Sequence, residues 1–262
     1  MNHRIQRSGL IFLLMMYAAN SYAIELPGVL QYERVVELSI PVSGVVSRVY
    51  VEEGQTVPKG ELLLELEEVP FKARLDKIAA DLRLLKAERE AIEKELNRDK
   101  ELYQRMVLST VSLDGTRLKF IRADSLWQAK KAEYKLAQYN FDKSHLLAPF
   151  AGKVIDRVAE PGQSIRVDMQ PPVLFTLADT TDFIVETEVS SEKISSLTHG
   201  TKLEVRTLGK VYDAVVKSST LLAPGRSLSQ PARYRVRVKL DKTDADFRPG
   251  QAATLILPTA AK

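Results

Sequence analysis

The sequence predicts an α+β protein in which a small β sandwich is split by a long antiparallel α-helical coiled-coil hairpin and is followed by a small β barrel. Three observations lead to this prediction. One β motif occurs twice, the residues between the two copies have coiled-coil spacing, and short strand-like segments follow the second copy. The length of 262 residues allows one to three small domains.

Residues 1–23 are predicted to form a secretory signal peptide. Arg4 and Arg7 precede an apolar run, and Ser21 and Ala23 occupy the −3 and −1 positions of a small-residue cleavage site. The apolar run is too short to cross a bilayer core of about 30 Å, so a retained membrane anchor is the weaker alternative. Removal of the peptide lowers the net charge from +4 to +2. A charge this small gives no reason to expect nucleic acid as a partner.

The chain contains no cysteine, which excludes disulfides, thiolate metal sites, a cysteine nucleophile and a lipid anchor on cysteine. After residue 23 it has two histidines, His145 and His199, and two methionines, Met106 and Met169, which are too few for a convincing metal site. It has no G-x-S-x-G, H-E-x-x-H or P-loop motif. We therefore expect a protein that is not an enzyme and that has no catalytic, cofactor-binding or metal site.

The repeated motif begins as "PVSGVVSRVYVEEGQTV" at Pro41 and recurs as "PFAGKVIDRVAEPGQSI" at Pro149. Each copy keeps two glycines, and all four are predicted to lie in turns of the half-motifs: Gly44, Gly54, Gly152 and Gly162. Neither copy can bury its apolar face alone. Residues 40–69 and 147–178 are therefore predicted to fold together as one sandwich, after a short strand region at 24–39.

Residues 70–146 are predicted to form the helical hairpin. In the first arm a heptad seam is formed by Leu75, Ile78, Leu82, Leu85, Ile92, Leu96, Tyr103 and Met106, with Arg89 and Asp99 in its two polar positions. In the second arm the expected seam is Leu118, Ile121, Ser125, Ala129, Ala132, Leu136 and Tyr139. At 1.5 Å per residue the first arm is about 50 Å long, so the hairpin is a rod and not a core element.

Residues 179–258 are predicted to form the barrel, and 259–262 a tail. Four strands are expected, at Phe183–Val189, Lys202–Leu208, Tyr234–Leu240 and Ala252–Leu257. In the third strand the alternate positions Arg233, Arg235, Arg237 and Lys239 are all basic. This basic face is either a solvated surface or a binding site for an anionic partner.

These pieces and their order resemble the periplasmic adaptor proteins of Gram-negative efflux pumps, also called membrane fusion proteins of the HlyD family. The resemblance rests on "LLAPFAGKVIDRVAEPGQSI" in the second copy and on the barrel ending "FRPGQAATLIL". It implies that the sandwich is lipoyl-like and that the chain works in the periplasm, associated with the inner membrane through partners. It also implies an inner-membrane transporter and an outer-membrane channel as partners, and self-association in a hexameric ring or with a partner adaptor.

The resemblance further implies that the hairpin tip contacts the channel. Many tips of the family carry Arg-x3-Leu-x6-Ser, and Arg98, Leu102 and Ser109 have that spacing. In the alternative interpretation, Leu102 is a seam residue and Ser109 only caps the second helix.

Several alternatives remain at this point. The transporter is expected to be an RND-type pump that exports small molecules, with an ABC-type exporter as the alternative. A structural coiled-coil spacer of the envelope is a third function, and a biotin or lipoate carrier is disfavoured because the hairpin replaces the turn that would hold the modified lysine. Typical family members continue beyond the barrel into a membrane-proximal domain, which we expect this chain to lack because it ends at Lys262.

Overall fold

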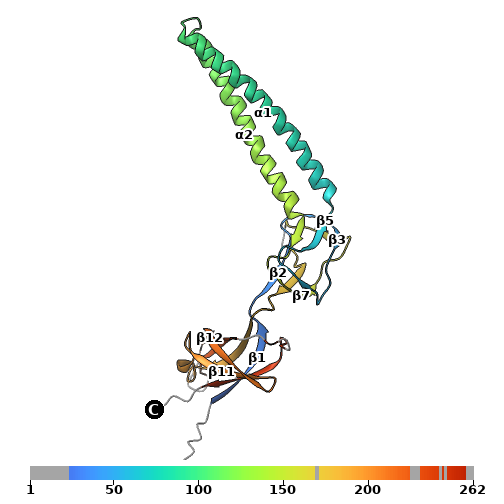
Figure 1. The fold of residues 1–262 in the computed structure, drawn as a ribbon, viewed down its shortest axis with the longest axis vertical. Coiled ribbons are helices and arrows are strands. Elements are labelled where there is room, and N and C mark those ends of the chain that lie inside the picture. The colour runs from blue at the N-terminus through green and yellow to red at the C-terminus, as the bar shows by residue number, and fades with distance from the viewer. Residues whose placement is uncertain (1–23, 169–170, 225–230, 242–243, 245–246, 258–262) are drawn as a thin grey trace, which may run out of the picture. The chain divides into compact units, whose positions relative to one another are not determined.

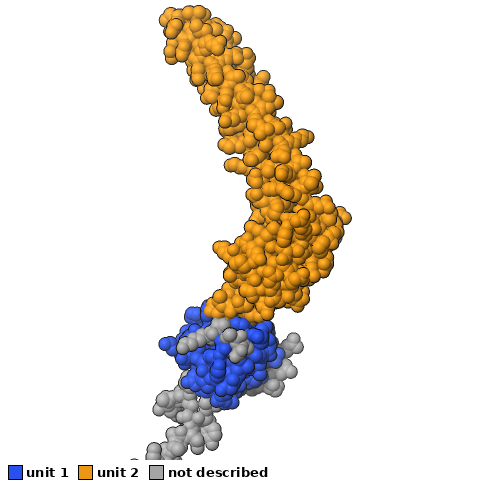
Figure 2. Space-filling model, turned by 45° about the vertical axis from the view of Figure 1, so that its right-hand side comes forward, with its two compact units in different colours: residues 1–31, 183–262 blue, residues 32–182 orange. Residues whose placement is uncertain are grey.

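The computed structural model describes residues 24–168, 171–224, 231–241, 244 and 247–257. The predicted signal peptide, 1–23, and the predicted tail, 259–262, lie outside the described residues. The chain divides into two compact units, residues 1–31 with 183–262 and residues 32–182, which are coloured separately in Figure 2. The predicted fold class is confirmed: a β sandwich, a hairpin of two long helices and a closed barrel are all present (Figure 1).

The sandwich of residues 32–182 has two four-stranded antiparallel sheets. In one sheet the strand order is β2 (Val35–Leu38), β9 (Phe175–Ala178), β7 (Gly152–Arg157), β4 (Thr56–Val57). In the other sheet the order is β6 (His145–Leu147), β5 (Leu62–Leu66), β3 (Gly44–Val49), β8 (Ser164–Ile165). Each sheet contains strands from both copies of the motif. Val46 and Val154, which are equivalent in the two copies, are both buried in the shared core. Neither copy therefore has a core of its own.

The two copies are joined through their equivalent turns. Gly54 N donates to Val154 O at 2.7 Å, and Val154 N donates to Gln55 O at 2.9 Å. In the other copy Gly162 N donates to Val46 O at 2.8 Å, and Val46 N donates to Gln163 O at 2.9 Å. Each turn thus pairs with the strand of the other copy, and the exchange is reciprocal.

The turns have the same internal construction. Gly54 and Gly162 have φ of +84° and +85°, a conformation that glycine adopts without steric cost. The following glutamine folds back, so that Glu52 N donates to Gln55 Oε1 at 3.0 Å. Glu160 N likewise donates to Gln163 Oε1 at 3.1 Å. Each turn therefore satisfies a backbone N–H group without using the sheet.

Gly44 and Gly152 do not lie in turns, and the prediction for these two residues is corrected. They are the first residues of β3 and β7. A Cβ on Gly152 would lie 2.3 Å from the carbonyl oxygen of Ala178, and one on Gly44 would lie 3.0 Å from Leu66 Cδ1. Glycine is needed at position 152 because the Ala178 carbonyl approaches closely, whereas a side chain at position 44 would require Leu66 to shift by a few tenths of an ångström.

The hairpin consists of α1 (Glu68–Gln104, 37 residues) and α2 (Thr110–Lys143, 34 residues), which pack along their length. Its base is fixed because β5 leads into α1 and β6 follows α2. These two strands pair antiparallel, with Leu62 opposite Leu147 and Glu65 opposite His145. The rise of 1.5 Å per residue makes α1 about 55 Å long.

The barrel has six strands in the order β1 (Ile24–Tyr32), β10 (Phe183–Ser190), β13 (Arg233–Leu240), β12 (Lys210–Ala223), β11 (Lys202–Thr207) and β14 (Ala252–Leu257). A short 3₁₀ helix, Ile194–Ser196, follows β10. The predicted strand region 24–39 does not form a separate element. In the structure β1 closes the barrel by pairing with β14, and β2 belongs to the sandwich.

The sequence predicts β1 as part of a strand region but not as a barrel strand, and it does not predict β12. In β1 the dipeptide Pro27-Gly28 looks like a turn, but Gly28 is required because its Cβ would lie 2.6 Å from Val185 Cγ1. In β12 the polar stretch Lys217–Thr220 interrupts the apolar pattern. Both strands are held by pairing with distant neighbours, which the local pattern does not reveal.

A third turn with a positive-φ glycine followed by a glutamine occurs in the barrel. Gly250 has φ of +88°, and Arg248 N donates to Gln251 Oε1 at 2.9 Å. Gly250 N donates to Leu30 O at 2.8 Å, and Leu30 N donates to Gln251 O at 2.9 Å. This turn therefore pairs with β1 through the same two backbone hydrogen bonds that join the two halves of the sandwich.

Gly152→Ala is expected to destabilise the sandwich by about 1–3 kcal/mol, because the new methyl group overlaps the Ala178 carbonyl oxygen. Gly115→Ala is the matched control, since nothing lies within 4 Å of its Cβ. Alanine is favoured over glycine inside a helix by up to about 1 kcal/mol. Urea denaturation followed by circular dichroism compares the two variants. Unchanged stability of Gly152→Ala would contradict the close approach described here.

Candidate functional site

The face of α1 that meets α2 is largely the predicted one. Leu75, Ile78, Leu82, Leu85, Ile92 and Leu96 are buried or half-buried, as are the polar residues Arg89 and Asp99. The prediction is wrong at the end of the helix, where Tyr103 and Met106 are exposed. Leu102, which is half-buried, takes their place in the seam.

The seam predicted for α2 is wrong. All seven of its residues are exposed: Leu118, Ile121, Ser125, Ala129, Ala132, Leu136 and Tyr139. The residues that are buried or half-buried against α1 follow another heptad pattern, Leu113, Thr116, Phe120, Ala123, Trp127, Lys130, Tyr134, Ala137 and Phe141. The larger aromatic side chains bury more apolar surface, and this favours the second pattern over the first.

Arg89 forms a polar layer inside the hairpin. Its Nε donates to Asp124 Oδ1 at 2.5 Å and its Nη1 donates to Glu93 Oε2 at 2.9 Å. The guanidinium carbon also lies 5.2 Å from the Phe120 ring centre and 5.1 Å from that of Trp127. The hydrogen bond to Asp124, with the nearby carboxylate charges, raises the pKa of Arg89. A polar layer of this kind fixes the register of two helices, because sliding would separate the charges.

Three further bonds between the helices agree with this register. Thr116 Oγ1 donates to Asp99 Oδ2 at 2.6 Å. Lys119 Nζ lies 3.3 Å from Glu95 Oε1, and Lys130 Nζ lies 3.7 Å from Asp81 Oδ2. The hydrogen bond from Lys130 to Glu133 raises the pKa of Lys130 despite its partial burial. The hairpin is therefore held in one register along most of its length.

The three residues predicted for the tip contact occupy different positions. Arg98 is exposed near the end of α1, and Leu102 is half-buried between the helices. Ser109 is the N-cap of α2, where its Oγ accepts a hydrogen bond from Ser112 N at 3.2 Å. Leu102 and Ser109 thus have the structural roles of the alternative interpretation, and neither role prevents a contact with a partner. Arg98 and Ser109 are both exposed, so each is accessible to a partner.

Three exposed apolar residues at the tip were not among the predicted contact residues. Met106 has φ of +60° and is 95% exposed, and Val107 and Val111 are also exposed. A left-handed conformation at a non-glycine residue is uncommon and costs about 1–2 kcal/mol. The signal was present in the sequence, because Val107 and Val111 are apolar residues between the two predicted seams, which end at Met106 and begin at Leu118.

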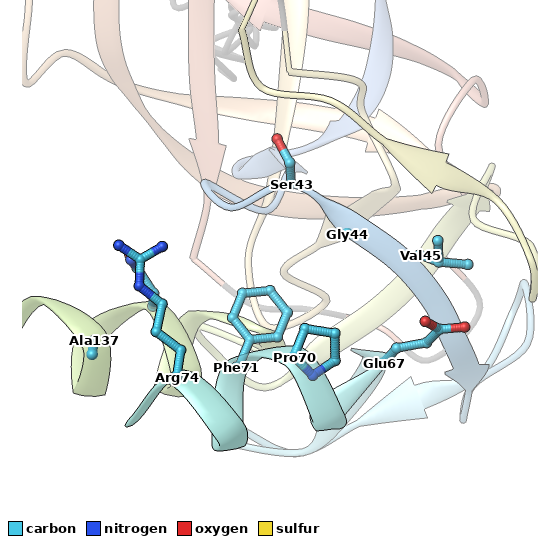
Figure 3. A pocket seen from close by; sticks show the side chains of 9 residues that line it. Ser43, Gly44, Val45, Glu67, Pro70, Phe71, Arg74 and Ala137 are labelled. Carbon is cyan, nitrogen blue, oxygen red and sulfur yellow. The ribbon is translucent and has the colours of Figure 1, made fainter. Parts of the chain in front are cut away.

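A pocket of about 280 Å³ lies at the base of the hairpin, where α1 meets the sandwich. Figure 3 shows Phe71 facing the strand that carries Gly44, with Arg74 beside it on the same helix. A Cβ on Gly44 would lie 3.6 Å from Phe71 Cε2. Phe71 packs against the sandwich core, so the first turn of α1 gives the hairpin a fixed base.

The basic face of β13 is balanced by carboxylates on β10. Arg235 Nε lies 3.0 Å from Glu186 Oε1, and Arg237 Nε lies 3.1 Å from Glu186 Oε2. Arg233 Nη1 lies 3.3 Å from Glu188 Oε2. These cross-strand ion pairs favour the interpretation of this face as a solvated surface over that of an anion site.

Nowhere in the described ranges do three or more His, Cys, Asp or Glu side chains gather as they would around a metal ion. Within the same ranges, no helix combines the length and the apolar character that a membrane span requires.

The sandwich and the hairpin together match a known protein family. A family model described as "CzcB-like, barrel-sandwich hybrid domain" matches residues 34–179. This chain belongs to the CzcB-like family. The matched CzcB-like region covers the sandwich strands of both copies and the whole hairpin between them. The match and the similar proteins below confirm the resemblance to membrane fusion proteins.

The CzcB-like chain is similar to curated proteins and to solved structures. "Macrolide export protein MacA" of Yersinia pestis is 26% identical over 250 residues, which are 89% of this chain and 67% of the relative. MacA of Escherichia coli O157:H7 is 28% identical over 196 residues, 70% of this chain and 53% of the relative. The chain therefore spans between about half and two thirds of these proteins. The membrane fusion protein Spr0693 from Streptococcus pneumoniae R6 has the same fold, with a TM-score of 0.72, 13% identity, and coverage of 91% of this chain and 100% of that one.

Asp124→Ala is expected to lower the urea midpoint of the hairpin, because it leaves the half-buried Arg89 without its cross-helix acceptor. Trp127 is the only tryptophan of the chain and lies beside Arg89, so its fluorescence reports unfolding at this point. Lys119→Ala is the control. It removes an exposed cross-helix pair, which contributes little to stability. Equal midpoints for the two variants would show that the Arg89 layer does not hold the hairpin together.

Proposed function

We propose that this chain is a periplasmic adaptor that links an inner-membrane transporter to an outer-membrane channel, for the export of small molecules across the envelope. The observation that carries the proposal is the hairpin of about 55 Å with an exposed apolar tip at Met106, Val107 and Val111. Apolar residues concentrated at the end of a rigid rod are typical of a protein contact. Membership of the CzcB-like family and the export role in the name of the MacA relatives support the same function.

In this function the hairpin works through its geometry. Arg98 offers guanidinium donors to carbonyl groups at the helix ends of the channel. Leu102 supports the tip from within the seam, and Ser109 starts α2 at a defined point through its cap. Met106 and Val107 supply the apolar contact. The predicted signal peptide would deliver the chain to the periplasm, where it stays at the inner membrane through its partners.

The transporter is proposed to be of the RND type, with an ABC-type exporter as the second candidate. A structural spacer of the envelope is the remaining alternative and would leave the tip without a channel. In-cell photo-crosslinking from a probe at Ser109 separates the adaptor from the spacer, since only the adaptor gives an adduct with an outer-membrane channel. A second probe at Arg235 on the barrel identifies the transporter by its adduct.

Leu102→Asp is expected to abolish export and the Ser109 adduct, because a charge in the seam beneath the tip disturbs the apolar contact surface. Leu126→Asp is the matched control. It puts the same charge on an exposed leucine in the middle of α2 and is expected to leave both readouts unchanged. The measurements are photo-crosslinking and resistance to toxic small molecules in cells that depend on the chain. Circular dichroism of both purified variants checks that the hairpin is folded.

Normal export by folded Leu102→Asp would overturn the tip contact. A Ser109 probe that captures no channel in cells with correctly exported protein would overturn the adaptor function and favour the spacer.

A further inference from the structure

The first helix of the hairpin ends in a Schellman motif, and Met106 occupies the left-handed position of that motif. Val107 N donates to Leu102 O at 3.0 Å, and Met106 N donates to Tyr103 O at 2.9 Å. These are the two backbone hydrogen bonds that define the motif. Met106 has φ of +60°, as the motif requires. The backbone at this point is therefore a regular helix end and not an irregular loop.

Glycine is the usual residue at this position, because it adopts a positive φ without a clash at Cβ. Of the eight described residues with positive φ, six are glycine and the other two are Met106 and Leu208. Leu208 lies in a tight turn, between the end of β11 at Thr207 and the start of β12 at Lys210. Met106 instead stands at the end of α1, where glycine would suit the backbone better. A strained residue of this kind indicates that its side chain has a function.

The function of that side chain is not packing within the chain. Met106 is 95% exposed, so almost none of its thioether rests on the hairpin. Val107 and Val111 are 71% and 82% exposed. These three side chains form the apolar tip on which the proposed channel contact depends. A chemical change at the sulfur would therefore alter this contact surface without removing packing that holds the hairpin together.

The thioether of Met106 is an accessible group that a two-electron oxidant attacks. The chain has no cysteine to react in its place, and Met106 and Met169 are the two methionines after residue 23. Hypochlorous acid is an oxidant of this class. The sulfur forms a bond to its oxygen, the O–Cl bond breaks, and chloride and a proton leave. The sulfur loses two electrons and the chlorine gains two, and the product is methionine sulfoxide.

We infer that Met106 is an oxidation-sensitive site that controls docking of the hairpin: the thioether permits the contact with the channel and the sulfoxide prevents it. The inference deepens the proposed adaptor function and rests on it. Burial of the sulfoxide oxygen against an apolar partner removes its water without supplying a hydrogen-bond donor. Oxidation has to precede docking, since a docked tip covers the sulfur. Methionine sulfoxide reductases restore the thioether, so the loss of docking is reversible.

The first test uses the purified full chain after export, treated with hypochlorous acid. Met169→Leu leaves Met106 as the only methionine after residue 23. The peptide that contains Met106 is expected to gain one oxygen atom in mass spectrometry, and to lose it on treatment with methionine sulfoxide reductases. The urea midpoint by circular dichroism is expected to equal that of Met106→Leu treated in the same way, because the side chain is exposed. An unoxidised Met106, or a lower midpoint than that of Met106→Leu, would overturn the inference.

The second test repeats the photo-crosslinking from Ser109 in cells. Hypochlorous acid is present while the chain is being induced, so that newly exported copies are oxidised before they dock. The channel adduct is expected to fall about tenfold relative to untreated cells, which is the effect of burying one polar group without a partner. Met106→Leu is the matched control. Its side chain is apolar and forms no sulfoxide, so its adduct is expected to be the same with and without oxidant, whatever its level in untreated cells.

An unchanged adduct from the natural sequence, with the Met106 sulfoxide confirmed by mass spectrometry of the same cells, would overturn the inference. An equal fall in the natural sequence and in Met106→Leu would place the sensitivity at another group and would also overturn it. Both results leave the adaptor function standing, because the adduct still forms without oxidant. A Ser109 probe that captures no channel even in untreated cells removes the adaptor function, and the inference with it.

Discussion

The reciprocal pairing of two turns with two strands is the constraint on which residues 32–182 depend. Gly54 and Gln55 pair with Val154, and Gly162 and Gln163 pair with Val46. Because each turn bonds to the other copy, neither half of the sandwich can form its hydrogen bonds before the other arrives. Once both are present, β5 and β6 lie side by side and hold the two ends of the hairpin together. The hairpin is thus inserted between two paired strands of the sandwich, and these strands set the direction in which it leaves the sandwich.

The hairpin adds a second constraint, which is register. A purely apolar seam between two helices tolerates sliding, since one leucine can replace another. The Arg89–Asp124 and Asp99–Thr116 bonds do not, because sliding would leave a charged or hydroxyl group in the seam without its partner. These polar pairs therefore fix the position of the tip relative to the base. A position fixed in this way suits a rod that must reach a partner at its far end.

The architecture could be predicted from the sequence, but the face of α2 that packs against α1 could not. The seam of α1 was correct through Asp99 because that helix has a single large-residue stripe. In α2 two stripes compete, and the buried one contains Thr116 and Lys130, which look unsuitable until their partners Asp99 and Asp81 are known. Gly44 and Gly152 were wrongly predicted to lie in turns for a related reason. A glycine required by a distant neighbour looks in the sequence like a glycine required by a turn.

The residues wrongly predicted as the α2 seam form an exposed apolar row on the other side of that helix. A helix that packs on one side only gains nothing from Leu118, Ile121 and Leu136 on its solvent side, and exposed apolar residues in a row increase the risk of non-specific association. An exposed apolar row of this kind is typical of a surface that contacts another protein. The sequence could not separate this row from the buried one, because both recur with heptad spacing and only the positions of Asp81, Arg89 and Asp99 on α1 decide which of them meets that helix.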